Sequence, residues 1–61
     1  MKGKVKFFNE QKGFGFIVGE DGLDYFVHVS DIGQETLYDD EDVEFTPSTN
    51  NRGRKATQIE K

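Results

Sequence analysis

Cysteine and tryptophan are absent from this 61-residue chain, and histidine, proline and methionine each occur once. Without cysteine the chain can form neither a disulfide framework nor a thiolate zinc site, which fits a reducing compartment. A single histidine cannot build a multi-histidine metal centre, so no metal or other cofactor is expected. The sequence also lacks an apolar run near the roughly 20 residues that span a bilayer. The charged residues after Met1 are not followed by an apolar stretch, so we expect no secretory signal. We therefore expect a soluble cytoplasmic protein without a membrane partner.

The chain has little length with which to build a core or a pocket. We expect a single domain over residues 1–61. A chain of this size hides only about 60% of the surface that its unfolded form exposes, so its core must be small. The lone histidine has no serine, cysteine or paired base beside it at a recognisable spacing. We therefore expect neither an enzyme nor a small-molecule substrate.

Charge is unevenly distributed along the chain. Residues 1–17 carry four lysines against Glu10, a net charge of +3. Residues 18–51 carry ten carboxylates and neither lysine nor arginine, and residues 52–61 return to +3 with four cations against Glu60. The formal net charge is −4, yet charges at physiological salt are screened over about 8 Å. A local basic patch can therefore attract a polyanion although the whole molecule is acidic.

Hydrophobic and polar residues alternate with a period of two, which predicts strands rather than helices. Strands are expected over residues 2–8, 13–18 and 25–29, with weaker candidates at 43–46 and 56–60. The one short helical piece is expected over residues 30–33, as a 3₁₀ turn capped by Ser30. Turn-forming residues fill segments 9–13, 19–24, 31–42 and 47–53. Five short strands in one small chain predict an all-β barrel.

The second and third predicted strands each present rings on one face. The ring face comprises Phe14, Phe16, Phe26 and His28, and the opposite face comprises Gly15, Ile17, Tyr25, Val27 and Val29. If the opposite face forms the core, the rings form an exposed apolar patch, which usually marks a binding surface. The alternative places the rings inside, but Gly15 would then be a poor residue for an exposed strand. In the first strand we expect Phe7 to be exposed, whereas the orientation of Phe8 stays open.

Six of the eight aromatic residues lie between Phe7 and Phe26, interleaved with Lys6 and Lys12. Rings stack on bases while cations meet phosphates, so this arrangement is typical of a surface for unpaired nucleic acid. Within it, residues 12–18 (KGFGFIV) closely follow the ribonucleoprotein pattern. The RNA-recognition-motif fold also needs two amphipathic helices, for which this sequence has no pattern. The motif therefore indicates RNA or DNA binding on another fold.

Three segments, in this order and spacing, resemble the cold-shock domain family: GKVKFFN at 3–9, KGFGFI at 12–17 and DYFVHVS at 24–30. The resemblance continues more weakly through Leu37, VEF at 43–45 and NRG at 51–53 to Ile59. It implies a five-stranded antiparallel oligonucleotide-binding (OB) barrel that binds single-stranded RNA or DNA on its second and third strands. Members of the family act as RNA chaperones or as modulators of transcription or translation, without catalysis. We expect such a module to act as a monomer.

The resemblance also implies roles for individual residues. Phe14, Phe16, Phe26 and His28 would stack on bases, Lys6, Lys12 and Arg52 would contact the nucleic-acid backbone, and Asp24 would accept a hydrogen bond from a base edge. Phe7 occupies a position usually filled by tryptophan and should stack with less area. Val29 stands where the family usually has phenylalanine. The stretch 32–37 is shorter than in typical bacterial members, and Tyr38 is the one candidate for its usual aromatic residue. Both departures predict weaker binding or a shorter footprint.

An alternative function is a protein-interaction module whose exposed rings dock an apolar or proline-rich peptide, as SH3-like barrels do. A peptide groove does not require cations beside the rings, so Lys6 and Lys12 favour nucleic acid. Binding that stays constant from low to high salt would favour the peptide, because phosphate contacts are salt-dependent.

Overall fold

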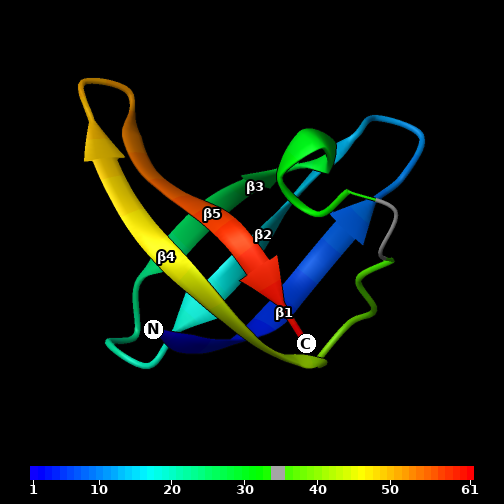
Figure 1. The fold of residues 1–61 in the computed structure, drawn as a ribbon, viewed down its shortest axis with the longest axis horizontal. Coiled ribbons are helices and arrows are strands. Elements are labelled where there is room, and N and C mark those ends of the chain that lie inside the picture. Colours follow the sequence, from blue (N-terminus) through cyan, green and yellow to red (C-terminus); the bar gives the residue numbers. More distant parts are fainter. Residues whose placement is uncertain (34–35) are drawn as a thin grey trace.

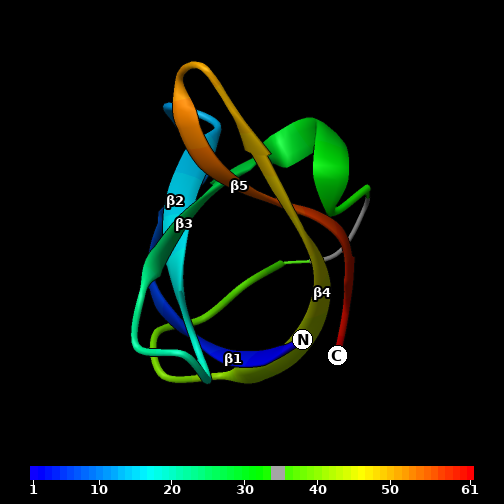
Figure 2. The ribbon, with the colours of Figure 1, turned by 90° about the vertical axis from the view of Figure 1, so that its left-hand side faces the viewer.

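The computed structural model describes residues 1–33 and 36–61, and five strands in them close into a barrel. The strands are β1 (Lys2–Asn9), β2 (Phe14–Gly19), β3 (Asp24–His28), β4 (Asp42–Asn50) and β5 (Gly53–Glu60), with a 3₁₀ turn η1 (Val29–Asp31) after β3. Around the barrel the strand order is β1-β2-β3-β5-β4. Figure 1 shows the strands face-on, and Figure 2 shows them curving round a ring.

The expected all-β, five-stranded barrel is confirmed, with one departure in strand direction. Four of the junctions are antiparallel, but β3 and β5 run parallel, so the barrel is not wholly antiparallel. This junction is narrow, because a single pair, Phe26 with Lys55, is in register. Within residues 1–33 and 36–61, no helix is long and apolar enough to cross a membrane.

The core is built mainly from aliphatic side chains, as the alternation in β2 and β3 predicts. Its buried members are Val5, Ile17, Tyr25, Val27, Ile32, Leu37, Val43, Phe45 and Ala56. The rings of Phe14, Phe16 and Phe26 are half-buried and His28 is exposed, so none of them belongs to this cluster. The alternative arrangement, with those rings inside the barrel, is therefore wrong.

A β-bulge in β1 decides the orientation of its two phenylalanines. Val5 pairs with Ile17 of β2, but the next registered pair joins Phe7 to Phe16, so Lys6 is the extra residue. The extra residue reverses the alternation of side chains along β1. Phe7 therefore shares the outer face of Phe16, as expected, and is 39% exposed. Phe8 turns inward and packs against the core.

Two expectations for the end of β3 are wrong. Val29 was expected on the inner face of a strand 25–29, but β3 ends at His28 and Val29 begins η1, where it is 39% exposed. The expected cap, Ser30, lies inside the turn, and His28 caps it instead, with its side chain accepting from the Ser30 amide. The expected short stretch 32–37 includes Gln34 and Glu35, which lie outside the described residues.

Candidate nucleic-acid interface

Four phenylalanine rings form a continuous row on the outer face of β1, β2 and β3, and His28 lies in register beside one of them. We call these rings together the aromatic platform; its members are Phe7, Phe14, Phe16, Phe26 and His28. The ring centroid of Phe16 lies 5.7 Å from that of Phe7 and 5.9 Å from that of Phe26. Phe14 and Phe26 stack at 5.8 Å with 24° between their planes. In register Phe14 faces His28, so the platform brings together every ring that the sequence places in the site.

Gly15 allows the strands beneath the platform to approach closely. It is buried opposite Phe8, and a Cβ there would lie against the carbonyl oxygen of Phe7 and 2.7 Å from the Phe8 Cα. A real Cβ does not tolerate such contacts with backbone atoms. A glycine at this position therefore lets β1 lie against β2 and sets Phe7 beside Phe16.

His28 is oriented by the turn that it caps. The backbone N–H of Ser30 donates to His28 Nδ1 at 3.2 Å, and Ser30 Oγ lies 3.0 Å from the same nitrogen. Because Nδ1 accepts the amide hydrogen, the neutral ring carries its own hydrogen on Nε2. The ring is thereby held with a donor available to a base or a phosphate at the end of the platform.

The cations expected at the site differ in how they are held. Lys6 Nζ lies 3.3 Å from Asp24 Oδ2, so the expected backbone contact and the expected base-edge acceptor form one exposed ion pair. Lys12 lies in the turn before Phe14, where its amide donates to Asn9 Oδ1 at 3.1 Å. Arg52 lies in the turn between β4 and β5 and is exposed. The structure therefore distributes these cations around the platform rather than in one cluster.

A groove of about 700 Å³ runs between the platform and the β4–β5 hairpin. One side is formed by Phe16, Asp24, Phe26, His28 and Ser30, and the other by Asn50, Arg52, Gly53, Arg54 and Lys55. The site residues expected from the sequence include Arg52 but not Arg54 or Lys55, which follow it in the same basic run 52–55. Its charge was the signal that could have identified them.

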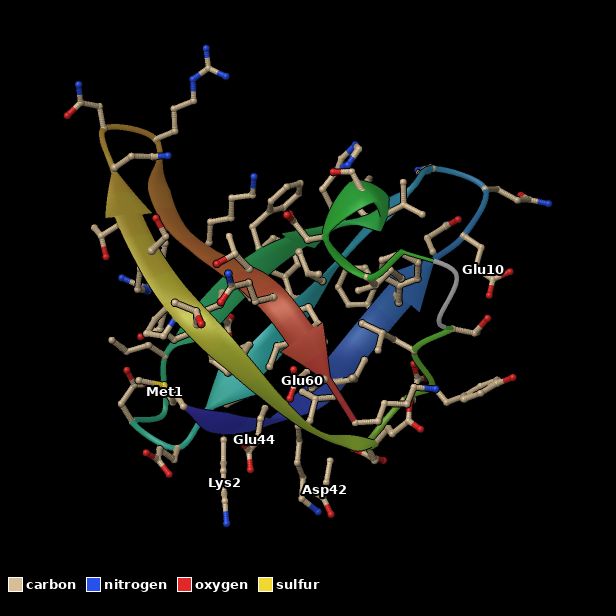
Figure 3. The ribbon with its side chains drawn as sticks, in the orientation of Figure 1. Met1, Lys2, Glu10, Asp42, Glu44 and Glu60 are labelled. Carbon is tan, nitrogen blue, oxygen red and sulfur yellow. The ribbon has the colours of Figure 1, made fainter. Side chains whose placement is uncertain are left out.

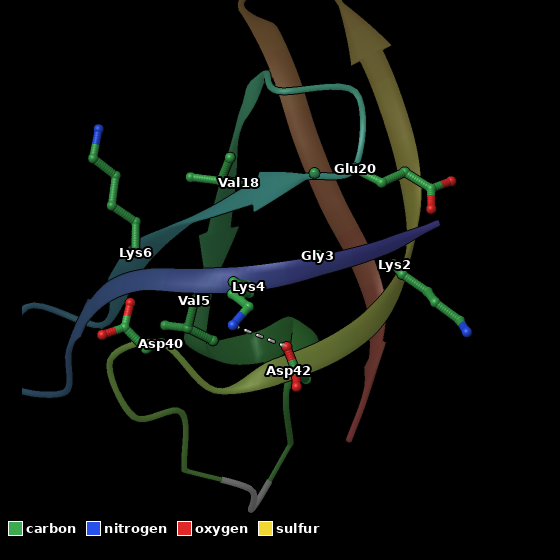
Figure 4. A pocket seen from close by; sticks show the side chains of 10 residues that line it. Lys2, Gly3, Lys4, Val5, Lys6, Val18, Glu20, Asp40 and Asp42 are labelled. Carbon is green, nitrogen blue, oxygen red and sulfur yellow. Dashed lines mark ion pairs between the residues drawn. The ribbon is translucent and has the colours of Figure 1, made fainter.

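A second hollow, of about 520 Å³, lies on the outer face of β1 and holds balanced charges (Figure 4). Its lining includes three lysines (Lys2, Lys4 and Lys6) and three carboxylates (Glu20, Asp40 and Asp42). Lys4 Nζ and Asp42 Oδ1 are 3.8 Å apart. Figure 3 shows Lys2, Asp42 and Glu44 at the same end of the barrel. Because opposite charges compensate here, this hollow offers little attraction to a polyanion.

Tyr25 links the core to the turn between β2 and β3. Its hydroxyl donates to Asp21 Oδ2 at 2.6 Å, and the Leu23 amide donates to Asp21 Oδ1 at 3.0 Å. The hydrogen bond from Tyr25, followed by that from Leu23, holds the pKa of Asp21 below its ordinary value of 3.8. The same bond raises the pKa of Tyr25 above 10.0. Among the described residues, no group of three or more His, Cys, Asp or Glu side chains could hold a metal ion.

Comparison with known proteins gives matches along the whole chain. Residues 1–61 match the family described as "'Cold-shock' DNA-binding domain". "Cold shock protein 2" of Lactiplantibacillus plantarum is 48% identical over 61 residues, with 95% of this chain and 92% of that protein covered. "Cold shock-like protein CspC" of Bacillus cereus is 47% identical over 64 residues, with coverage of 100% and 98%. "Cold shock protein CspB" of Bacillus caldolyticus is 44% identical over 63 residues, with coverage of 98% and 96%.

Proposed function

This chain belongs to the cold-shock DNA-binding domain family, whose members bind nucleic acid, and from that premise we propose how it does so. The protein binds single-stranded RNA or DNA by stacking unpaired bases on the aromatic platform. The observation that carries this proposal is the row of four contacting phenylalanine rings on the outer face of three strands, with His28 in register beside Phe14. These rings lie outside a small core, where exposed apolar area is otherwise unfavourable.

Stacking energies are sufficient for useful affinity. Each base stacked on an aromatic ring contributes roughly 1–3 kcal/mol, as judged by alanine substitution. Four or five such contacts support micromolar to nanomolar binding once the free-energy cost of ordering the strand is subtracted. Every base presents a flat face, so we expect only a mild sequence preference.

Polar side chains around the platform complete the proposed site. Lys12, in the β1–β2 turn, and Arg52, in the β4–β5 turn, contact phosphates, and Asp24 accepts a hydrogen bond from a base edge. An exposed ion pair such as Lys6 with Asp24, at 3.3 Å, contributes only about 0–1 kcal/mol. A bound strand can therefore replace it at little cost, with phosphate on the lysine and a base on the carboxylate.

The biological role follows from binding without chemistry. A protein that holds bases on its surface keeps them from pairing, which is the action of an RNA chaperone or of a modulator of transcription or translation. The family is non-enzymatic, and we extend this to the present chain. We place it in the cytoplasm as a monomer of one domain, with unpaired transcripts as its partners.

The decisive experiment compares outward and inward residues of β2. Phe14→Ala and Phe16→Ala should each weaken binding of a fluorescently labelled oligouridylate by about 1–3 kcal/mol and leave the fold intact. Ile17→Ala, at a fully buried position, should instead lower the free energy of unfolding by about 2–5 kcal/mol. Titrations would use fluorescence anisotropy, and stability would be followed by circular dichroism. Phenylalanine variants that unfold, or that bind unchanged, would contradict the proposal, and salt-independent binding would favour a peptide ligand.

A further inference from the structure

The narrow parallel junction between β3 and β5 leaves a groove beside the platform. Phe26 and Lys55 are the one pair in register across it among the described residues. Rings line one wall of the groove, and the β4–β5 hairpin forms the other. A strand whose bases rest on the rings would therefore have its sugar–phosphate chain beside the hairpin.

Arg54 lies at the rim of this groove, and within residues 1–33 and 36–61 its Nε is the one donor with a hydrogen bond. Its Nε donates to the backbone oxygen of Asp24 at 3.1 Å, and its guanidinium carbon lies 5.9 Å from the centroid of the Tyr25 ring. These contacts occupy one edge and one face of the guanidinium. The two Nη groups are the pair that grips a phosphate through parallel hydrogen bonds.

Lys55 is held on the opposite side of the same rim. Its ammonium lies 3.4 Å from Asp31 Oδ2, and the two side chains are 39% and 19% exposed. Asp31 Oδ2 is buried and has no hydrogen bond from any described residue. The ion pair with Lys55 is therefore its one polar contact within the described part of the chain. An ammonium carries three donors, so Lys55 can meet a phosphate while it keeps this carboxylate.

The balance of charge distinguishes this groove from the hollow on β1. Its lining holds three cations, Arg52, Arg54 and Lys55, against the carboxylate of Asp24, and Asp31 pairs with Lys55 from outside the lining, so the cations remain in excess. The hollow on β1 has three lysines and three carboxylates. A polyanion is therefore attracted to the groove and not to the hollow.

We infer that Arg54 and Lys55 are further nucleic-acid-binding residues, which hold the phosphates of a strand lying in the groove between β3 and the β4–β5 hairpin. This inference rests on the proposed function and adds to it the path of the backbone. Both cations are already positioned by protein contacts, so little side-chain freedom is lost when a phosphate binds.

The test is the salt dependence of binding. Arg54→Gln and Lys55→Gln should each reduce the slope of log affinity against log salt by about 0.7, the value for one lost phosphate contact on a single strand. Each should weaken binding of a labelled oligouridylate about two- to five-fold at low salt. Lys2→Gln, an exposed charge on the hollow of β1, is the matched control and should leave the slope unchanged.

Further variants separate phosphate contact from a loss of fold. Lys55→Gln leaves Asp31 without its partner, so the pair Asp31→Asn with Lys55→Gln should fold and still show the reduced slope. Lys55→Arg and Arg54→Lys keep the charge and should retain the wild-type slope. If the groove variants and Lys2→Gln all bind like wild type while Phe14→Ala weakens binding, the backbone path is wrong and the proposed function stands. If the wild type itself does not bind the oligonucleotide, the proposed function fails.

Discussion

Tyr25 is the residue through which the core contacts both the β2–β3 turn and the groove. Its ring is 4% exposed and packs 5.0 Å from that of Phe45. Its hydroxyl reaches out to Asp21, and Arg54 lies over its ring. A buried tyrosine normally needs such a polar partner. Contacts made by one side chain therefore support the turn and the position of a groove cation together.

The hydrogen bond between Tyr25 and Asp21 predicts two pH windows for stability. The pKa of Asp21 is lower in the folded chain than its ordinary 3.8. The ionised Asp21 carboxylate therefore stabilises the fold above pH 3.8. This stabilisation is lost as the pH falls through the pKa of the folded chain. The pKa of Tyr25 is raised above its ordinary 10.0. The protonated Tyr25 hydroxyl therefore stabilises the fold below pH 10.0, and this stabilisation is lost as the pH rises through the pKa of the folded chain.

Tyr25→Phe should remove the alkaline effect and weaken the acid one, because it deletes the hydroxyl and leaves the ring, while the Leu23 amide still donates to Asp21. We expect a lower thermal midpoint at neutral pH and a shallower decline on the acid and alkaline sides. Thermal unfolding followed by circular dichroism across the pH range measures this. Tyr38→Phe, at a ring that is 63% exposed, is the control and should keep the wild-type profile. Identical profiles for Tyr25→Phe and wild type would show that the bond does not contribute.

At the scale of the strand, the bulge in β1 gives two neighbouring phenylalanines opposite roles. The period of two predicts β2 and β3 well, since their inner and outer faces follow strict alternation. In β1 the same rule places Phe7 with Val5, and only a bulge removes it from that face. A bulge arises from pairing with the neighbouring strand, so no pattern within β1 reveals it. The orientation of Phe8 therefore could not be predicted from the sequence.

Phe7→Ala and Phe8→Ala should consequently separate binding from stability. Phe7→Ala should weaken oligonucleotide binding by about 1–3 kcal/mol and change stability by no more than about 0.5 kcal/mol. Phe8→Ala should lower the free energy of unfolding by about 2–3 kcal/mol, somewhat less than for a fully buried phenylalanine, because Phe8 is only partly buried. Urea unfolding and anisotropy titration of both variants provide the comparison. Equal losses of stability would contradict the orientation that the bulge imposes.

The strands beyond the platform show a second limit of the sequence pattern. Pro47 predicted a turn over residues 47–53, but β4 continues through it to Asn50. β1 pairs with β4 only at residues 42–44, so beyond Glu44 one edge of β4 has no partner strand among the described residues. Proline lacks the N–H that a paired edge would need, and an unpaired edge tolerates it. Which edge is free depends on barrel closure, which local composition does not encode.

A phenylalanine in place of Val29, just after β3, should give the platform an additional stacking position. The Val29 amide donates to the Gly13 carbonyl at 2.8 Å, so this exposed side chain lies next to the start of β2 and its ring Phe14. Val29→Phe should add a ring there and tighten binding by about 1–3 kcal/mol, with a footprint longer by about one base. Val29→Leu controls for added apolar area without a flat face. Anisotropy titrations with oligouridylates of increasing length measure both effects. Equal affinities for the two variants would exclude an added stacking position.

At the scale of the whole molecule, five of the eight Lys and Arg side chains lie around the platform and groove, and three lie elsewhere. Lys4 and Lys61 are each within 4 Å of a carboxylate, Asp42 and Glu41 respectively, away from the groove. The other cations around the platform and groove are Lys6, Lys12, Arg52, Arg54 and Lys55. An acidic protein with a formal charge of −4 can in this way present a basic surface to a strand.

This placement of the cations predicts a strong preference for single strands over duplexes. Five phosphate contacts give a salt slope of about −3.5 on a single strand. A duplex carries one charge per ~1.7 Å and would meet the acidic remainder of the molecule as well as the cations. Its bases are also stacked inside the helix, so the platform has nothing to bind. The loss of even two stacking contacts at the lower end of 1–3 kcal/mol weakens binding about thirty-fold. The difference in affinity is measured by displacing a labelled oligouridylate with unlabelled single strands and with a duplex of equal length. A duplex that competes equally well would show that charge, not stacking, drives binding.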